Sequence, residues 1–221
     1  MIAITKGAEP DILQQNGAAW TAEYMNAKAA GTLTNTIRFR YRHPEIKSAI
    51  LLEASEKCVY CEGKITHVHP GETEHILPSS KRPDLIVNWP NLTLVCTECN
   101  RRKSNYYEPA EPLLNPYQDD PAEHLMFAGP IVLPKGDMGR RTWMQFEFKG
   151  RMSLVERKLE KLEKMALLLE KYSALPEGKT KEFLAKELLS EAAPRAEFAA
   201  TARCFLASQL GWKFDKTGAR I

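Results

Sequence analysis

The sequence lacks the features that define several classes of protein. No apolar run approaches the roughly 20 residues that a membrane-spanning helix requires, so we expect no membrane association. Low-complexity stretches are absent, and 43% hydrophobic with 27% charged residues is a globular composition, which excludes a disordered or fibrous chain. Glu9 and Asp11 fall where a secretory signal would be apolar. We therefore expect a cytoplasmic protein.

The sequence also has little excess charge. Its 31 Lys and Arg against 28 Asp and Glu leave a formal net charge of +3, which permits a nucleic-acid partner without predicting one. Any attraction to phosphates must therefore come from local clusters of basic residues. No Gly-x-x-x-x-Gly-Lys-Ser/Thr motif occurs, so ATP chemistry would have to belong to another chain.

Cysteine is scarce, yet four of the five cysteines form two Cys-x-x-Cys pairs. Cys58 and Cys61 make the first pair, and Cys96 and Cys99 make the second. In a reducing compartment such pairs bind metal more often than they form disulfides, and four thiolates suit tetrahedral Zn²⁺. The pairs therefore predict structural zinc, with redox-active or metal-free thiols as the alternative. We expect the isolated Cys204 to be a small buried apolar side chain.

Helical patterns lie on both sides of the cysteine pairs. Residues 12–30 and 44–56 read as helices, the second opened by a proline. Residues 108–142 are punctuated by prolines and read as irregular chain, and an alternating pattern over 143–148 indicates a short strand. Two more helices are expected near 180–193 and 195–210.

A longer helix is expected directly after residue 150. Its apolar residues recur at spacings of three and four over about three heptads, as a seam made by Met152, Val155, Leu159, Leu162, Ala166 and Leu169. This seam could dock a partner or pack against the chain's own core. We expect four segments: an N-terminal helical segment (1–56), a zinc-bound core (57–107), an irregular proline-rich wrap (108–150) and a C-terminal helical region (151–221).

The stretch between the cysteine pairs carries groups suited to phosphodiester hydrolysis. This reaction needs a base to take a proton from water and a cation where charge builds on the leaving oxygen. His75 suits the base, because imidazole titrates near neutral pH. Glu74 precedes it, and neighbouring strand residues point to opposite faces, so both can serve one site only if the strand bends or ends there.

The order Glu74-His75, then Asn91, then Cys96-x-x-Cys99-Asn100 resembles the HNH endonuclease family over roughly residues 57–105. The resemblance implies a ββα-metal fold, in which a hairpin of residues 72–76 and 92–95 precedes a helix that carries Asn100. It implies that Glu74 and Asn100 hold Mg²⁺ or Mn²⁺. It also implies that Asn91 ties the loop between the strands and so positions His75. We expect an α+β, mostly helical fold: a small zinc-stapled HNH core with helical extensions at both ends.

Two basic clusters are candidates for nucleic-acid contact. Arg101, Arg102 and Lys103 follow the second cysteine pair and, in the HNH interpretation, meet substrate phosphates. Arg38, Arg40 and Arg42 alternate with aromatic residues, a pattern that suits backbone neutralisation with base stacking. Either cluster could instead be a solvated surface. We interpret His67 and His69 as exposed loop residues, with a functional role left open, and His124 as structural.

A narrower resemblance is carried by Lys57-Cys58-Val59-Tyr60-Cys61, Asn88-Trp89-Pro90-Asn91, Asn115-Pro116 and Asp119-Asp120-Pro121. These motifs are similar to the PtuB-like HNH subunits of the Septu defence system and of related retron cassettes. The resemblance implies an anti-phage role beside an ABC-like ATPase, with the C-terminal helices as a docking surface. Since one HNH site cuts one strand, a homodimer is left open.

The sequence therefore predicts a metal-dependent endonuclease that leaves 5′-phosphate and 3′-hydroxyl ends. DNA is the first expectation for its substrate, and a structured RNA is the alternative. Two rival functions remain open, a non-catalytic zinc-knuckle module that binds nucleic acid and an adaptor that scaffolds the ATPase. Loss of cleavage on changing His75 would separate the enzyme from both.

Overall fold

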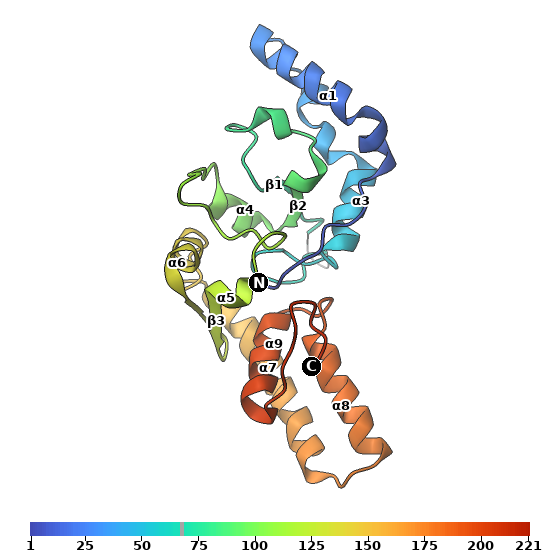
Figure 1. The fold of residues 1–221 in the computed structure, drawn as a ribbon, viewed down its shortest axis with the longest axis vertical. Helices are drawn as coiled ribbons and strands as arrows, with labels where there is room; N and C mark the ends of the chain where they lie inside the picture. The colour runs from blue at the N-terminus through green and yellow to red at the C-terminus, as the bar shows by residue number, and fades with distance from the viewer. Residues whose placement is uncertain (67–68) are drawn as a thin grey trace. The chain divides into compact units, whose positions relative to one another are not determined.

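A computed structural model describes residues 1–66 and 69–221. Helices predominate, and the strands form small antiparallel hairpins (Figure 1), which confirms the mostly helical α+β class. Within the described residues, no helix combines the length and the apolar character needed to cross a membrane. The chain divides into two compact units, a first unit of Ile4–Val59 and Lys64–Pro112 and a second unit of Met1–Ala3, Tyr60–Gly63 and Leu113–Ile221.

The first unit begins with the helices that the sequence predicted. The first, α1 (Asp11–Ala30), ends at Gly31, whose left-handed φ of 71° closes the helix by a hydrogen bond back to its last turn. Short helical turns, α2 (Asn35–Arg38) and η1 (Arg40–Arg42), lead into α3 (Pro44–Glu53). Helix α3 is three residues shorter than the predicted helix of residues 44–56. Its end coincides with positive φ values at residues 55 and 56, which turn the chain toward the first cysteine pair.

The centre of the first unit is the predicted hairpin and helix. Strand β1 (Glu72–His75) pairs antiparallel with β2 (Leu92–Val95), and α4 (Thr97–Lys103) follows directly (Figure 1). The connection between the strands contains the 3-10 turns η2 (Pro83–Leu85) and η3 (Trp89–Asn91). Helix α3 packs on β2, and the fully buried side chains of the two elements supply the apolar core: Ile46, Ile50, Leu92, Leu94 and Val95.

The second unit is more regular than the proline content of 108–142 predicted. It contains α5 (Pro121–His124) and an antiparallel hairpin of β3 (Leu125–Ala128) and β4 (Ile131–Pro134). The strand predicted over 143–148 is wrong, because α6 (Gly136–Gln145) occupies its first half and the rest is a turn, in which the N–H of Phe146 still bonds to the carbonyl of Thr142. Six alternating residues are too few to separate a strand from the end of a helix.

Three helices complete the second unit, α7 (Met152–Ala174), α8 (Lys179–Ala192) and α9 (Ala199–Leu210), which lie side by side (Figure 1). Their buried core includes Met165, Leu188 and Leu206. The predicted seam is only partly correct. Met152 and Leu159 are 62% and 46% exposed, and the buried face of α7 consists of Leu154, Lys158, Leu162 and Met165.

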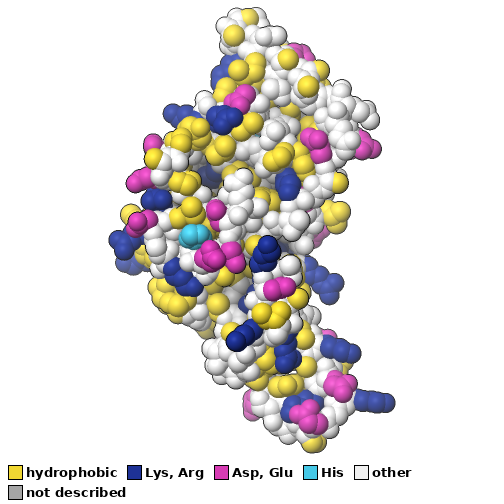
Figure 2. Space-filling model, in the orientation of Figure 1, with side chains coloured by type: hydrophobic (Ala, Val, Ile, Leu, Met, Phe, Trp, Pro, Cys, Tyr) yellow, Lys and Arg dark blue, Asp and Glu magenta, His cyan; other side chains and the backbone are white. Residues whose placement is uncertain are grey.

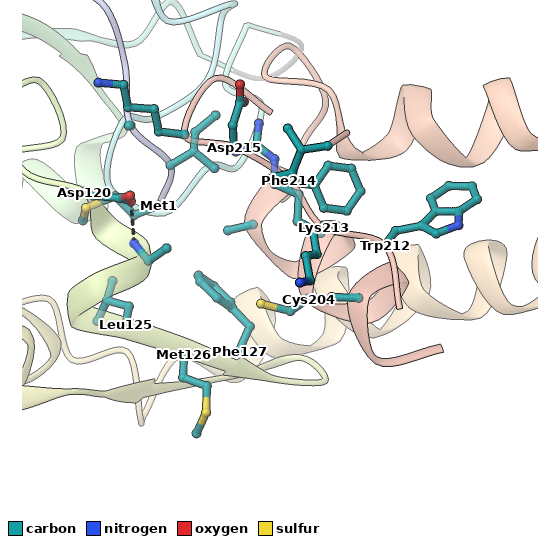
Figure 3. A pocket seen from close by; sticks show the side chains of 18 of the residues that line it. Met1, Asp120, Leu125, Met126, Phe127, Cys204, Trp212, Lys213, Phe214 and Asp215 are labelled. Atoms are coloured by element: carbon teal, nitrogen blue, oxygen red, sulfur yellow. Dashed lines mark hydrogen bonds between the residues drawn. The ribbon is translucent and has the colours of Figure 1, made fainter. Parts of the chain in front are cut away.

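The second unit also contains an open pocket of about 450 Å³. Leu125 and Phe127 of β3, Cys204 of α9 and Phe214 of the C-terminal residues line it (Figure 3). Cys204 is therefore half-buried in a cavity wall, not enclosed in the core as the sequence suggested. Burial raises the pKa of its thiol, so the thiol form dominates at neutral pH.

Candidate metal centre and active site

The four paired cysteines converge on one point. The sulfur atoms of Cys58, Cys61, Cys96 and Cys99 lie within 4.8 Å of one another. Tetrahedral Zn²⁺ with bonds of 2.3 Å would place its sulfur ligands roughly 3.8 Å apart, so this spacing fits one ion. Three of these cysteines are buried, Cys96 is half-buried, and none forms a disulfide, so all four can supply the thiolate ligands that zinc prefers. The arrangement supports the predicted zinc-stapled core.

Local hydrogen bonds explain how each pair reaches this point. The sulfur of Cys96 caps α4 by accepting from the N–H of Cys99 at 3.4 Å, which places the second pair at the positive end of the helix. The N–H of Val59 donates to the carbonyl of Leu94 at 3.1 Å and so fixes the first pair to β2. Zinc at this position would link the first cysteine pair, which is held to β2, to the start of α4.

The face of β1 toward α4 is acidic. Glu72 and Glu74 are two residues apart and therefore project from the same face of the strand. The Nζ of Lys103 donates to Oε1 of Glu74 at 2.8 Å and to the carbonyl of His75 at 2.9 Å. The side-chain amide nitrogen of Asn100 donates to Glu72. Burial raises the pKa of Glu74, although Lys103 opposes this effect.

The oxygen donors on this face suit a hard divalent cation. Glu72 and Glu74 supply carboxylates and Asn100 supplies an amide, and Mg²⁺ or Mn²⁺ binds such groups together with water. The predicted ligand pair of Glu74 and Asn100 thus lies in one layer between β1 and α4. The specific role of each residue in metal binding stays a prediction.

His75 lies at the end of β1 and is 5% exposed. Its Nε2 is 2.8 Å from the carbonyl oxygen of Ile86, and the ring of Tyr41 meets it edge-on at 4.5 Å between centroids. A carbonyl only accepts, so Nε2 carries the hydrogen and Nδ1 keeps the lone pair. Burial lowers the pKa of His75 to about 4, so the ring is neutral at pH 7.

Asn91 ties the loop that leaves β1. Its Oδ1 accepts from the N–H of Leu77 at 2.8 Å, and its Nδ2 donates to the carbonyl of Leu77 at 3.1 Å. Its own carbonyl accepts from the N–H of Ile76 at 2.9 Å. These are the side-chain-to-backbone bonds expected for this residue, and they fix the backbone directly after His75. A contribution of Asn91 to catalysis stays a prediction.

The basic residues of α4 differ in their access to a ligand. Arg101 is 65% exposed and Arg102 only 12% exposed, and both guanidinium groups bond to Glu98. Lys103 is buried on Glu74, so its ammonium supports the strand in this structure. Phosphate binding by these three residues stays a prediction.

The predicted cluster of Arg38, Arg40 and Arg42 folds into α2 and η1. Arg40 pairs with Glu23, and Arg42 lies over the ring of Phe39 at 4.4 Å. Because Tyr41 of the same segment contacts His75, the cluster borders the candidate base. The sequence contained no signal for this neighbour, since the contact joins residues 34 positions apart.

Glu72 is the other functional candidate that sequence reasoning missed. The signal for it was available, because a residue two positions before Glu74 on a strand must share its face. Of the remaining histidines, His69 accepts from the N–H of Gly71 at 3.0 Å and His124 ends α5. His67 lies outside the described residues.

Comparison with known proteins identifies the family to which the hairpin, α4 and the cysteine pairs are similar. Residues 58–106 match the HNH endonuclease family. The Septu protein PtuB of Bacillus thuringiensis is 31% identical over 171 residues, which cover 72% of this chain and 66% of that protein. The Septu protein PtuB of Bacillus mycoides (strain KBAB4) is 29% identical over 161 residues, which cover 58% and 55%. The chain thus spans between about half and two thirds of the length of these relatives.

Proposed function

The chain belongs to the HNH endonuclease family through residues 58–106, and from this premise we propose that it hydrolyses nucleic-acid phosphodiester bonds with a divalent metal. The observation that carries the proposal is the state of His75 at the end of β1. Its ring is held by a carbonyl at Nε2 and is neutral at pH 7. It stands beside two carboxylates of β1 and the Asn100 amide of α4.

In this proposal His75 is the general base. Its Nδ1 lone pair accepts a proton from the water that attacks phosphorus, and its pKa of about 4 keeps that lone pair available over the whole neutral range. Glu74 and Asn100 hold Mg²⁺ or Mn²⁺, which when bound stabilises the charge on the departing 3′ oxygen. Asn91 fixes the loop after His75. The products carry 5′-phosphate and 3′-hydroxyl ends.

We propose DNA as the substrate, with RNA as the alternative outcome. Figure 2 shows basic and acidic side chains interspersed over the face it presents, so contact with phosphates must depend on a few residues near the site. Arg101 is the exposed cation of α4, and Arg42 borders His75 through Tyr41. These two residues are the first candidates for phosphate contact.

The test is cleavage of supercoiled plasmid and of total tRNA by the zinc-loaded chain with Mg²⁺, Mn²⁺ or EDTA. His75→Ala is expected to abolish cleavage and to keep one zinc per chain, and EDTA at a level that spares zinc is expected to stop the wild type. His124→Ala, in the second unit, is the matched control and should cut normally. Nucleic-acid binding without cleavage by the wild type would favour the non-catalytic zinc-knuckle function instead.

We also propose that the chain acts in anti-phage defence in the cytoplasm, beside an ABC-like ATPase. Its similarity to Septu protein PtuB supports this proposal. Cells that express the chain together with such an ATPase should resist phage, and His75→Ala should remove the resistance. Resistance that survives His75→Ala would favour the adaptor function. A homodimer that supplies two sites for both strands stays a prediction.

A further inference from the structure

Glu72 is bound to a residue of the proposed metal site. It projects from the same face of β1 as Glu74, toward α4. There it accepts a hydrogen bond from the side-chain nitrogen of Asn100. An ionised carboxylate offers no hydrogen, so only the NH₂ end of the Asn100 amide can face Glu72. The contact therefore selects one of the two orientations of that amide.

The orientation decides what Asn100 can offer to a cation. The nitrogen and oxygen of an amide diverge from one carbon, so an amide whose nitrogen is held by Glu72 turns its oxygen away from Glu72. Oxygen is the atom that Mg²⁺ and Mn²⁺ bind, whereas an amide NH₂ group offers only hydrogens. With the amide reversed, Asn100 would present those hydrogens to the cation.

We propose that Glu72 is a positioning residue of the catalytic metal site, which orients Asn100 so that its oxygen ligates the divalent cation. The inference rests on the proposed function and adds a residue to it. Outer carboxylates that orient a metal ligand contribute roughly 10- to 100-fold to metal affinity. Lys47 supports the placement of Glu72, since its Nζ donates to the carbonyl of Gly71 at 2.7 Å and its charge acts on Glu72.

Two substitutions separate positioning from direct ligation by Glu72. Glu72→Gln removes the charge but keeps an oxygen that can accept from Asn100. Asn100→Asp replaces the amide by a carboxylate whose two ends are both oxygen, so no orientation remains to be selected. If Glu72 only positions Asn100, its removal should lower the metal affinity of the chain that carries Asn100 but not that of the Asn100→Asp chain. If Glu72 is itself a ligand, its removal should lower the metal affinity of both chains.

The experiment measures Mn²⁺ binding to the zinc-loaded full chain by the electron paramagnetic resonance signal of free Mn²⁺. Glu72→Ala is expected to weaken binding about tenfold or more, and Glu72→Gln less than about threefold. Added to Asn100→Asp, Glu72→Ala is expected to cause no further weakening. Glu108→Ala, an exposed acid of the first unit, is the control and should bind as the wild type does. Glu72→Val, which suits a strand, replaces the Ala variant if zinc content or the melting curve shows that the latter is unfolded.

The outcomes separate this inference from the function beneath it. The positioning role is overturned if Glu72→Ala binds Mn²⁺ as tightly as the wild type. It is also overturned if Glu72→Ala weakens Mn²⁺ binding equally in the wild-type and Asn100→Asp chains. In both cases the metal site itself stands as long as Asn100→Ala lowers the affinity for Mn²⁺. If Asn100→Ala binds Mn²⁺ as tightly as the wild type, the proposed metal site fails as well.

Discussion

The strongest test of the loop geometry is Asn91→Ala. Asn91 is 5% exposed and bonds both to the N–H and to the carbonyl of Leu77, so its truncation leaves two backbone groups without their partner. Each unsatisfied group costs about 1–3 kcal/mol when it is buried. Leu77 is 37% exposed, so water can replace part of the loss. We therefore expect the free energy of unfolding to fall by about 2–3 kcal/mol.

The measurement is urea unfolding at a fixed concentration of free zinc, followed by tryptophan fluorescence. Asn88→Ala is the matched control, because Asn88 lies in the same loop, is exposed and bonds through its backbone, whose N–H donates to the carbonyl of Leu85 and whose carbonyl accepts from the N–H of Asn91. Its expected change is below about 0.5 kcal/mol. If Asn91→Ala is as stable as Asn88→Ala, the two bonds do not hold the loop and the reasoning is refuted.

Asn91→Asp tests the same bonds one at a time. A carboxylate keeps the acceptor for the N–H of Leu77 but loses the donor to its carbonyl, and it places a negative charge beside that oxygen. The new carboxyl should have a raised pKa in the folded chain, because burial and the nearby carbonyl disfavour its charge. A raised folded pKa adds stability as the pH falls through it. The free energy of unfolding that this variant loses relative to the wild type should therefore become smaller as the pH falls from 7 to 5.

Two further predictions concern a turn and a thiol. Gly71 has a φ of +72°, and an added Cβ would lie 2.7 Å from Cδ1 of Leu94, so Gly71→Ala should cost about 1–3 kcal/mol in the same unfolding assay. Gly150→Ala, with nothing within 4 Å, should cost far less, and equal losses would contradict the clash. Because burial raises the pKa of Cys204, its alkylation in the zinc-loaded chain should be slower than that of a free thiol and should still accelerate above about pH 9. A rate that levels off near pH 8 would contradict the raised pKa.

The hairpin, α4 and the thiolate cluster could be predicted because each is specified locally. The cysteine pairs have a fixed spacing, and the strand order follows the Glu74-His75, Asn91 and Asn100 motifs. Strand β1 also ends at His75, as it must if the neighbouring residues Glu74 and His75 are to serve one site. In such elements the information lies within a few neighbouring residues.

The burial of α7 could not be predicted in the same way. Apolar spacing selected Met152 and Leu159, both of which are exposed, whereas Lys158 is only 3% exposed. The ammonium of Lys158 lies 5.2 Å and 5.8 Å from the ring centroids of Phe127 and Phe198, a contact that the periodicity of α7 does not encode. Partners distant in sequence decided which face is buried, as they did for Tyr41 and His75.

The acidic face of β1 shows how a site for a divalent cation can be part of a stable fold. Two carboxylates on one strand face repel each other, and Glu72 indeed contributes to raising the pKa of Glu74. Lys103 balances Glu74 at 2.8 Å and also holds the carbonyl of His75, while Asn100 satisfies Glu72 without adding charge. Both partners come from α4, whose start is fixed by the thiolate cluster. In this arrangement the cysteine site sets the position of the helix, and the helix in turn sets the position and charge of the acids.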